Sequence, residues 1–151
     1  MEIWQLTATE LRQKISKGEI SAREATESHL SRMDQINVKI NAVAQSCETE
    51  ALKEADLIDD KCLRGDELGA LAGVPVTVKI NVDQRGYATT NGLQLQKDLV
   101  AKIDNPVVNN LRKAGAIIIG RTNTPAFSLR WFTRNTIPVS YTHLRAHETS
   151  I

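Results

Sequence analysis

The feature that most constrains the fold is an uninterrupted apolar run, Ala-Ile-Ile-Ile-Gly, at residues 116–120. A strand with one face in water alternates apolar and polar residues, and this run has no polar position. A continuous apolar run of this length is typical of a strand that is buried on both faces. The sequence therefore predicts an interior β-strand here.

A second strand and a helix precede that run. Residues Val76–Ile80 are mostly β-branched and follow a turn-rich segment, which predicts a strand. Asn105 before Pro106 predicts a helix cap and a first turn, and Gly115 ends that helix. Strand, helix and strand in this order predict a crossover unit of an α/β sheet.

The preceding part, residues 1–66, is predicted to be helical. Gly18 and Gly65 can end two of its helices, Ser21 with Glu24 forms a capping box, and a third helix is predicted to start near Ser46. Apolar residues recur at helical spacing in three groups. These groups are Leu6, Leu11 and Ile15; Ala22, Ala25, Met33 and Ile36; and Ala51, Ala55, Ile58 and Cys62. Helices are thus expected to give way to an α/β core at 71–136.

Charge and cysteine usage exclude some functions. The 19 basic and 18 acidic residues give a formal net charge of +1, so binding to nucleic acid or to a membrane is not expected. No apolar run approaches the roughly 18 residues of a spanning helix. Cys47 and Cys62 lack C-x-x-C spacing, and no apolar segment follows a basic start, so a cytoplasmic protein is expected. A small polar or neutral substrate fits this balance.

Lys79 is the first candidate functional residue because it interrupts an apolar strand. Period-two alternation places it on one face with Thr77 and Asn81, which an ordinary exposed polar strand face explains. A lysine in a buried cleft can instead lose its proton and act as a base, because burial disfavours the ammonium form. The second interpretation requires a nucleophile nearby.

Three segments, Leu71–Asp83, Gly86–Gly92 and Asn109–Phe127, closely resemble the amidase-signature family in order and spacing. The resemblance extends to about Asn135 and implies a large mixed α/β sheet that carries a Ser-cisSer-Lys triad without metal or organic cofactor. It makes Lys79 the base of that triad. Many members have Asp after this lysine where the chain has Ile80, and this departure leaves the substrate open.

The resemblance also implies what this sequence lacks. In the family, a neutral lysine activates a nucleophilic serine through a second serine and later protonates the leaving amine. Both serines belong to a glycine-rich segment that this sequence does not contain, and Ser128 and Ser140 are not in such a turn. The chain is therefore expected to be an inactive first part, residues 1–136, of an amidase that acts on a small carboxamide.

The segment after the second strand supplies candidate substrate contacts. Thr124 and Phe127 match a position where the family's chain turns toward the substrate, although a helix cap and a core aromatic explain them equally well. Thr124 before Pro125 predicts a short helix that carries Phe127, Leu129, Trp131 and Phe132. Trp131 and Phe132 are expected to pack against absent parts of the domain.

Two other functions remain open at this point. The chain can be a noncatalytic interaction module with a structural Lys79, or it can resemble the subunit of a tRNA-dependent amidotransferase that shares the amidase signature. A glycine-rich serine segment later in the gene would favour the enzyme. The substrate and the oligomeric state are not fixed by the sequence.

Residues 137–151 are interpreted as a non-native tail. His143 and His147 are spaced to share a helical face, but the order H-E-x-x-H and a third ligand are missing, so no metal site is predicted. Val139–Thr149 instead matches one reading frame of a transposon-type sequencing adaptor. The tail is therefore left out of the fold prediction.

Overall fold

In a computed structural model of the chain, residues 2–133 and 135 are described, and the tail interpreted as non-native lies outside them. The described residues form a mixed α/β structure, as predicted. Its helices are α1 (Ala8–Ser16), α2 (Ala22–Ile40), α3 (Glu48–Arg64) and α4 (Pro106–Lys113). Its strands are β1 (Val43–Ser46), β2 (Pro75–Lys79) and β3 (Ile117–Thr122), and short 3-10 turns lie at Ile3–Gln5, Gln94–Gln96 and Ala126–Ser128.

Capping boxes start the first two α-helices. The Ser21 hydroxyl accepts a hydrogen bond from the backbone N–H of Glu24 at 2.9 Å, and the Glu24 carboxylate accepts one from the backbone N–H of Ser21 at 2.8 Å. Thr7 and Glu10 repeat this arrangement at α1. Each box satisfies backbone donors that the first helical turn leaves free, which is why the sequence signal is reliable.

The prediction that residues 1–66 are helical is wrong at one place, because β1 lies between α2 and α3. Val43–Ser46 has only one β-branched residue, and its strand conformation depends on antiparallel pairing with β3. Gly120 of β3 faces β1 closely, since a Cβ there would lie 2.8 Å from Val43 Cγ1. The third helix begins at Glu48, close to the expected Ser46.

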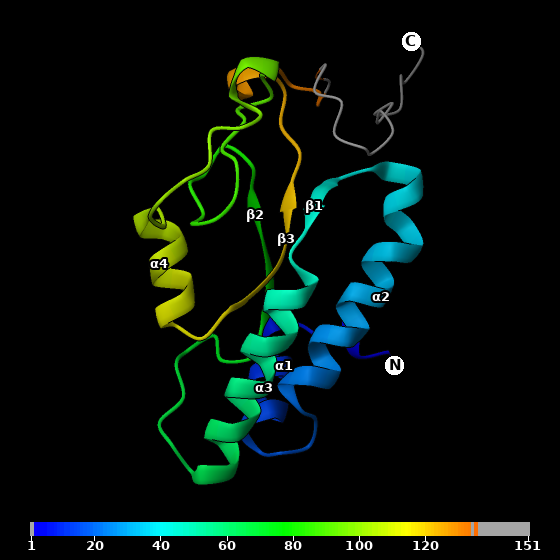
Figure 1. Cartoon of the computed structure of the whole chain (residues 1–151). Helices are drawn as coiled ribbons and strands as arrows, with labels where there is room; N and C mark the ends of the chain where they lie inside the picture. The colour runs from blue at the N-terminus through cyan, green and yellow to red at the C-terminus, as the bar shows by residue number, and fades with distance from the viewer. Residues whose placement is uncertain (1, 134, 136–151) are drawn as a thin grey trace.

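The sheet has the order β1-β3-β2, with β2 parallel to β3 (Figure 1). The strand-helix-strand unit is thus confirmed. Ile117 and Ile119 of β3 pack into the core made by α1, α2 and α3, whereas Ile118 packs with Val78 and Val108 on the α4 side. This two-sided burial explains the absence of polar residues from the run that predicted the strand.

Helix α4 begins and ends as the sequence predicts. The Asn105 side chain accepts a hydrogen bond from the backbone N–H of Val107 at 2.9 Å, and Pro106 follows at the first helical position. Gly115 has φ +83 and lies so close to Ala72 that a Cβ would be 2.8 Å from the Ala72 Cα. Glycine is required here both by the backbone conformation and by the close packing.

The segment after β3 differs from its prediction. Thr124 does not cap a helix, and the helical turn covers only Ala126–Ser128, so Leu129, Trp131 and Phe132 lie outside it. Phe127 and Ser128 have φ values of +52 and +60, a left-handed conformation that stops helix propagation. Within the described residues, no helix is long and apolar enough to cross a membrane.

Candidate functional site

Lys79 is the last residue of β2, and its side chain is exposed between buried Val78 and Ile80. It pairs in register with Thr122 of β3. Its ammonium group has no hydrogen-bond or ion-pair partner among residues 2–133 and 135. The exposure of Lys79 and of Thr77 agrees with the ordinary polar strand face, and the role of Lys79 as a base, which requires burial of the amine, stays a prediction.

A hydrogen-bond chain joins the Lys79 strand to the turn after β3. Asn81, two residues after Lys79, donates from Nδ2 to the Ser128 Oγ at 3.0 Å. Ser128 Oγ lies 2.8 Å from Thr124 Oγ1, at hydrogen-bonding distance. Because parallel strands end at the same edge, β2 and β3 bring Lys79 and this turn to one end of the sheet. The sequence shows that Ser128 is not a typical nucleophile, but it gives no sign of this contact.

Thr124 and Phe127 occupy different environments. Thr124 is 0% exposed, and its hydroxyl donates to the backbone carbonyl of Pro125 at 3.2 Å, so it stabilises the turn from inside. Phe127 is 57% exposed, and its backbone N–H donates to the carbonyl of Asn91 at 2.8 Å. The Phe127 ring is thus open to an apolar group, whereas the Thr124 hydroxyl is engaged within the chain. Their roles in substrate binding stay predictions.

Arg121 is a further residue, and the sequence analysis did not single it out. Its side chain is 0% exposed. It donates to the backbone carbonyls of Ala88 at 2.7 Å, Val82 at 2.9 Å and Ile80 at 3.3 Å. Arg121 therefore fixes the loop that follows Lys79. The signal that could have revealed it is a cation immediately after the apolar 116–120 run.

The electrostatic environment of Arg121 is unusual because it has no direct carboxylate partner in the described residues. Burial lowers the pKa of the guanidinium, and the nearby Cys47 thiol and Asp83 carboxylate act in the opposite direction. The Tyr87 ring centroid lies 5.5 Å from the guanidinium carbon and adds a cation–π contact. Backbone carbonyls and one aromatic face thus take the place of a counter-ion.

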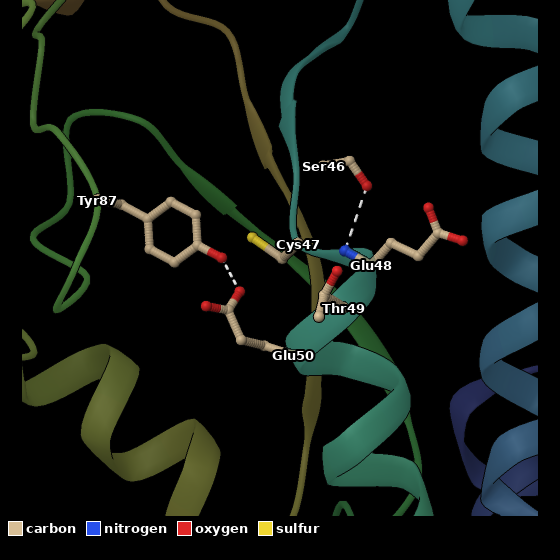
Figure 2. A pocket seen from close by; sticks show the side chains of 6 residues that line it. All are labelled: Ser46, Cys47, Glu48, Thr49, Glu50 and Tyr87. Atoms are coloured by element: carbon tan, nitrogen blue, oxygen red, sulfur yellow. Dashed lines mark hydrogen bonds between the residues drawn. The ribbon is translucent and has the colours of Figure 1, made fainter.

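A shallow hollow of about 330 Å³ lies at the start of α3 (Figure 2). Lys79 is not among the residues that line it. In Figure 2, the Tyr87 hydroxyl faces the Glu50 carboxylate and donates a hydrogen bond to it. The hollow is lined by Ser46, Cys47, Glu48, Thr49, Glu50 and Tyr87. It contains none of the three residues that the sequence predicted for the site.

The thiol in this hollow is poorly suited to nucleophilic chemistry. Cys47 is buried, and that burial raises the pKa of its thiol, with a Gln84 hydrogen bond acting in the opposite direction. A thiol that keeps its proton is a weak nucleophile and a weak metal ligand. Among residues 2–133 and 135, no group of three or more His, Cys, Asp or Glu side chains is arranged to hold a metal ion.

Comparison with known proteins identifies similar chains. The sequence model of the Amidase family matches residues 24–143. The chain is 50% identical over 133 residues to an indoleacetamide hydrolase of Bradyrhizobium diazoefficiens, covering 88% of this chain and 25% of that protein. It is 34% identical over 135 residues to a glutamyl-tRNA(Gln) amidotransferase subunit of Alkaliphilus metalliredigens, covering 89% of this chain and 28% of that one.

Solved structures of amidase-signature enzymes also match this chain. The chain superposes on a bacterial aryl acylamidase of the amidase-signature family with a TM-score of 0.85 and 26% sequence identity. That match covers 91% of this chain and 29% of the acylamidase. The chain thus spans about a quarter of the length of its curated relatives, between 25% and 28% for the two named above.

Proposed function

Because the chain belongs to the Amidase family, we propose that Lys79 is the base of an amide-hydrolysing site to which this chain contributes one part. The observation that carries the proposal is the position of Lys79, at the carboxyl end of a parallel strand and without a partner among the described residues. Substrates of open α/β sheets bind outside the carboxyl ends of the strands. We propose that other parts of the domain bury the Lys79 amine at that place, beside a serine and the substrate.

The proposed mechanism needs two serines from a segment outside this sequence. Acting as the base, the Lys79 amine accepts a proton from the bridging serine, which in turn accepts one from the nucleophilic serine as it attacks the amide carbon. The amide C–N bond then breaks, the leaving amine takes a proton back along the same route, and an acyl-enzyme forms. Water hydrolyses that ester with Lys79 again as base, which gives the acid and the free enzyme.

We propose a small carboxamide as substrate, supported by the 50% identity to a protein named indoleacetamide hydrolase. The exposed Phe127 ring is proposed to contact the apolar part of the substrate. Thr124 is proposed to support that contact by holding the turn through Ser128. Metal and organic cofactors have no step in this mechanism.

A subunit of a glutamyl-tRNA(Gln) amidotransferase is the second candidate, supported by the 34% identity to such a protein. Glutamine would then be the amide, and ammonia would pass to another site. The test uses the protein encoded by the complete reading frame: hydrolysis of indoleacetamide but not of glutamine would support the amidase, and the reverse preference would support the amidotransferase.

The domain assignment follows from the same proposal. Residues 1–136 form the first part of an amidase domain in a cytoplasmic protein, and residues 137–151 are a non-native tail. The boundary at 136 rests on the adaptor-like sequence alone, and the family match extends seven positions past it, to residue 143. Lacking both serines, the chain alone is proposed to be inactive.

A chimera tests the role of Lys79. Residues 2–135 of this chain would replace the matching first quarter of the Bradyrhizobium diazoefficiens hydrolase, and kcat would be measured on indoleacetamide. The chimera is expected to turn over substrate, and Lys79→Ala is expected to lower kcat by about 10²–10⁴-fold, the usual contribution of a general base.

Lys53→Ala is the matched control, because Lys53 is an exposed lysine on α3 far along the chain from the site. It should leave kcat unchanged. An active chimera that keeps full turnover with Lys79→Ala would contradict the proposal and favour a noncatalytic role for this segment. Circular dichroism of each variant separates a lost base from a lost fold.

A further inference from the structure

We propose that Asn81 is a positioning residue for Lys79, because its side-chain oxygen accepts a hydrogen bond from the Lys79 amine. This inference rests on the proposed function, since it assigns a neighbour to the proposed base. Lys79 is the last residue of β2, and Asn81 lies in the turn that follows, where it contacts the segment after β3 (Figure 1). One short piece of backbone therefore carries both residues.

The turn after β2 keeps Asn81 close to Lys79. The backbone N–H of Val82 donates to the carbonyl of Lys79 at 2.9 Å, which closes a four-residue β-turn with Ile80 and Asn81 at its centre. The first and last Cα atoms of a β-turn lie within about 7 Å of each other. The backbone N–H of Ile80 also donates to the carbonyl of Thr122 at 2.9 Å and holds the turn against β3. The flexible four-carbon stem of Lys79 can therefore bring its amine to the Asn81 amide.

The Asn81 side chain has one engaged atom and one without a partner. Its Nδ2 donates to the Ser128 Oγ at 3.0 Å, and that hydroxyl lies 2.8 Å from the Thr124 Oγ1, so the Asn81 amide is held in place. The Asn81 Oδ1 is buried and has no hydrogen-bond partner among residues 2–133 and 135. A buried acceptor without a donor is unfavourable, so this oxygen indicates that a further donor binds there.

Lys79 is the donor that fits. Its amine is two residues away in the same turn and has no partner of its own among the described residues. Once other parts of the domain bury that amine, its hydrogens need acceptors. A neutral amine has two N–H groups and one lone pair. A hydrogen bond to the Asn81 Oδ1 therefore orients the Lys79 amine and leaves its lone pair for the bridging serine.

The chimera with the Bradyrhizobium diazoefficiens hydrolase tests the inference. Asn81→Leu removes the Oδ1 acceptor and the bond to Ser128, and it is expected to lower kcat on indoleacetamide by about tenfold with KM nearly unchanged. Ser128→Ala removes that bond but keeps the Oδ1, so it is expected to lower kcat by less than about threefold. An asparagine that only holds the turn would make the two losses equal.

Asn81→Asp adds a readout that a purely structural asparagine would not affect. A carboxylate beside Lys79 favours the ammonium form and raises the pKa of the amine. The rise of kcat with pH should therefore move to higher pH than in the wild type. The charged groups of the adjoining segments are Asp83, which accepts a hydrogen bond from Thr89, and Arg121, which donates to backbone carbonyls. Both groups are the same in the wild type and the variant, so they do not account for the shift.

Asn109→Leu is the matched control, because Asn109 is an exposed asparagine on α4. It should leave kcat and the pH profile unchanged. If Lys79→Ala abolishes turnover while Asn81→Leu keeps wild-type kcat, or while Asn81→Leu and Ser128→Ala lose equally, the inference is overturned and the proposed function stands. An inactive chimera, or full turnover with Lys79→Ala, would contradict the proposed function and this inference with it. Circular dichroism checks each fold, and if Asn81→Leu does not fold, an unshifted pH profile of Asn81→Asp overturns the inference.

Discussion

The two faces of the sheet differ in how completely they are covered. On the helical side, α1, α2 and α3 enclose twelve buried residues, and Ile117 and Ile119 of β3 are among those twelve. On the α4 side the corresponding cluster has four: Cys47, Val78, Val108 and Ile118. The exposed aromatic residues Phe127, Trp131 and Phe132 belong to neither cluster. The helical side thus holds the larger core, which we call the helical core, whereas the α4 side buries fewer residues.

The largest expected effect comes from the helical core. Ile15 is 1% exposed, so Ile15→Ala should lower the free energy of unfolding by about 2–5 kcal/mol. Leu129 is 81% exposed, so Leu129→Ala should change it by less than about 0.5 kcal/mol. Urea unfolding followed by circular dichroism measures both. If Ile15→Ala does not fold, Ile15→Val should still cost about 1 kcal/mol. Equal losses of unfolding free energy in the Ile15 and Leu129 variants would contradict the difference between the two regions.

The buried Arg121 comes next. Arg121→Met should leave the carbonyls of Ile80, Val82 and Ala88 without their donor, at a cost of about 1–3 kcal/mol or more. Amide hydrogen exchange in residues 80–88 should accelerate in the same variant. Arg121→Lys keeps the charge but lacks the forked donors, so it should be intermediate. Unchanged exchange in Arg121→Met would show that the loop does not depend on this side chain.

Two serines sharpen the contrast between a global and a local effect. Ser21 caps α2, one of the helices around the helical core, and Ser21→Ala should cost about 1 kcal/mol in global unfolding. Ser128 links Asn81 to Thr124 in the turn after β3. Ser128→Ala should therefore speed hydrogen exchange of the turn amides and leave the global free energy of unfolding almost unchanged. Ser31→Ala, an exposed position within α2, is the control and should do neither.

The smallest expected effect is a pH dependence of the helix caps. Hydrogen bonds from the backbone and side chain of Ser21 lower the pKa of Glu24 below its ordinary 4.5. A lowered folded-state pKa means that the stabilisation is present above the unfolded-state value and is lost as the pH falls through the folded-state value. Stability should therefore decrease below about pH 4.5, and Glu24→Gln should weaken this dependence. A Glu24→Gln chain with the wild-type pH profile would contradict the assignment.

The sequence predicts those elements whose residues carry a local reason for their conformation. The Ser21–Glu24 capping box, the Asn105–Pro106 start of α4 and the apolar 116–120 run all act within a few residues, and the structure confirms each. β1 is not predictable in this way because its pairing with β3 is a long-range contact. The turn at 126–128 is shorter than the predicted helix because its left-handed residues are held by distant Asn91 and Asn81.

The candidate site is predictable only in part for the same reason. Lys79 interrupts an apolar pattern, which a reader of the sequence can notice. The contacts of Asn81 and Ser128, and the three carbonyls that Arg121 binds, depend on how the strand ends meet in space. The two serines of the proposed triad lie outside this sequence, so their distance from Lys79 does not follow from the sequence or from the structure.

The most direct test of the central claim is the DNA sequence of the source locus past the codon for Asn135. The account predicts that the reading frame continues without the adaptor-like tail into a glycine-rich segment that contains two serines, the groups that Lys79 would serve. An intact genomic locus that encodes residues 137–151 as they stand, or a longer frame without those serines, would contradict it.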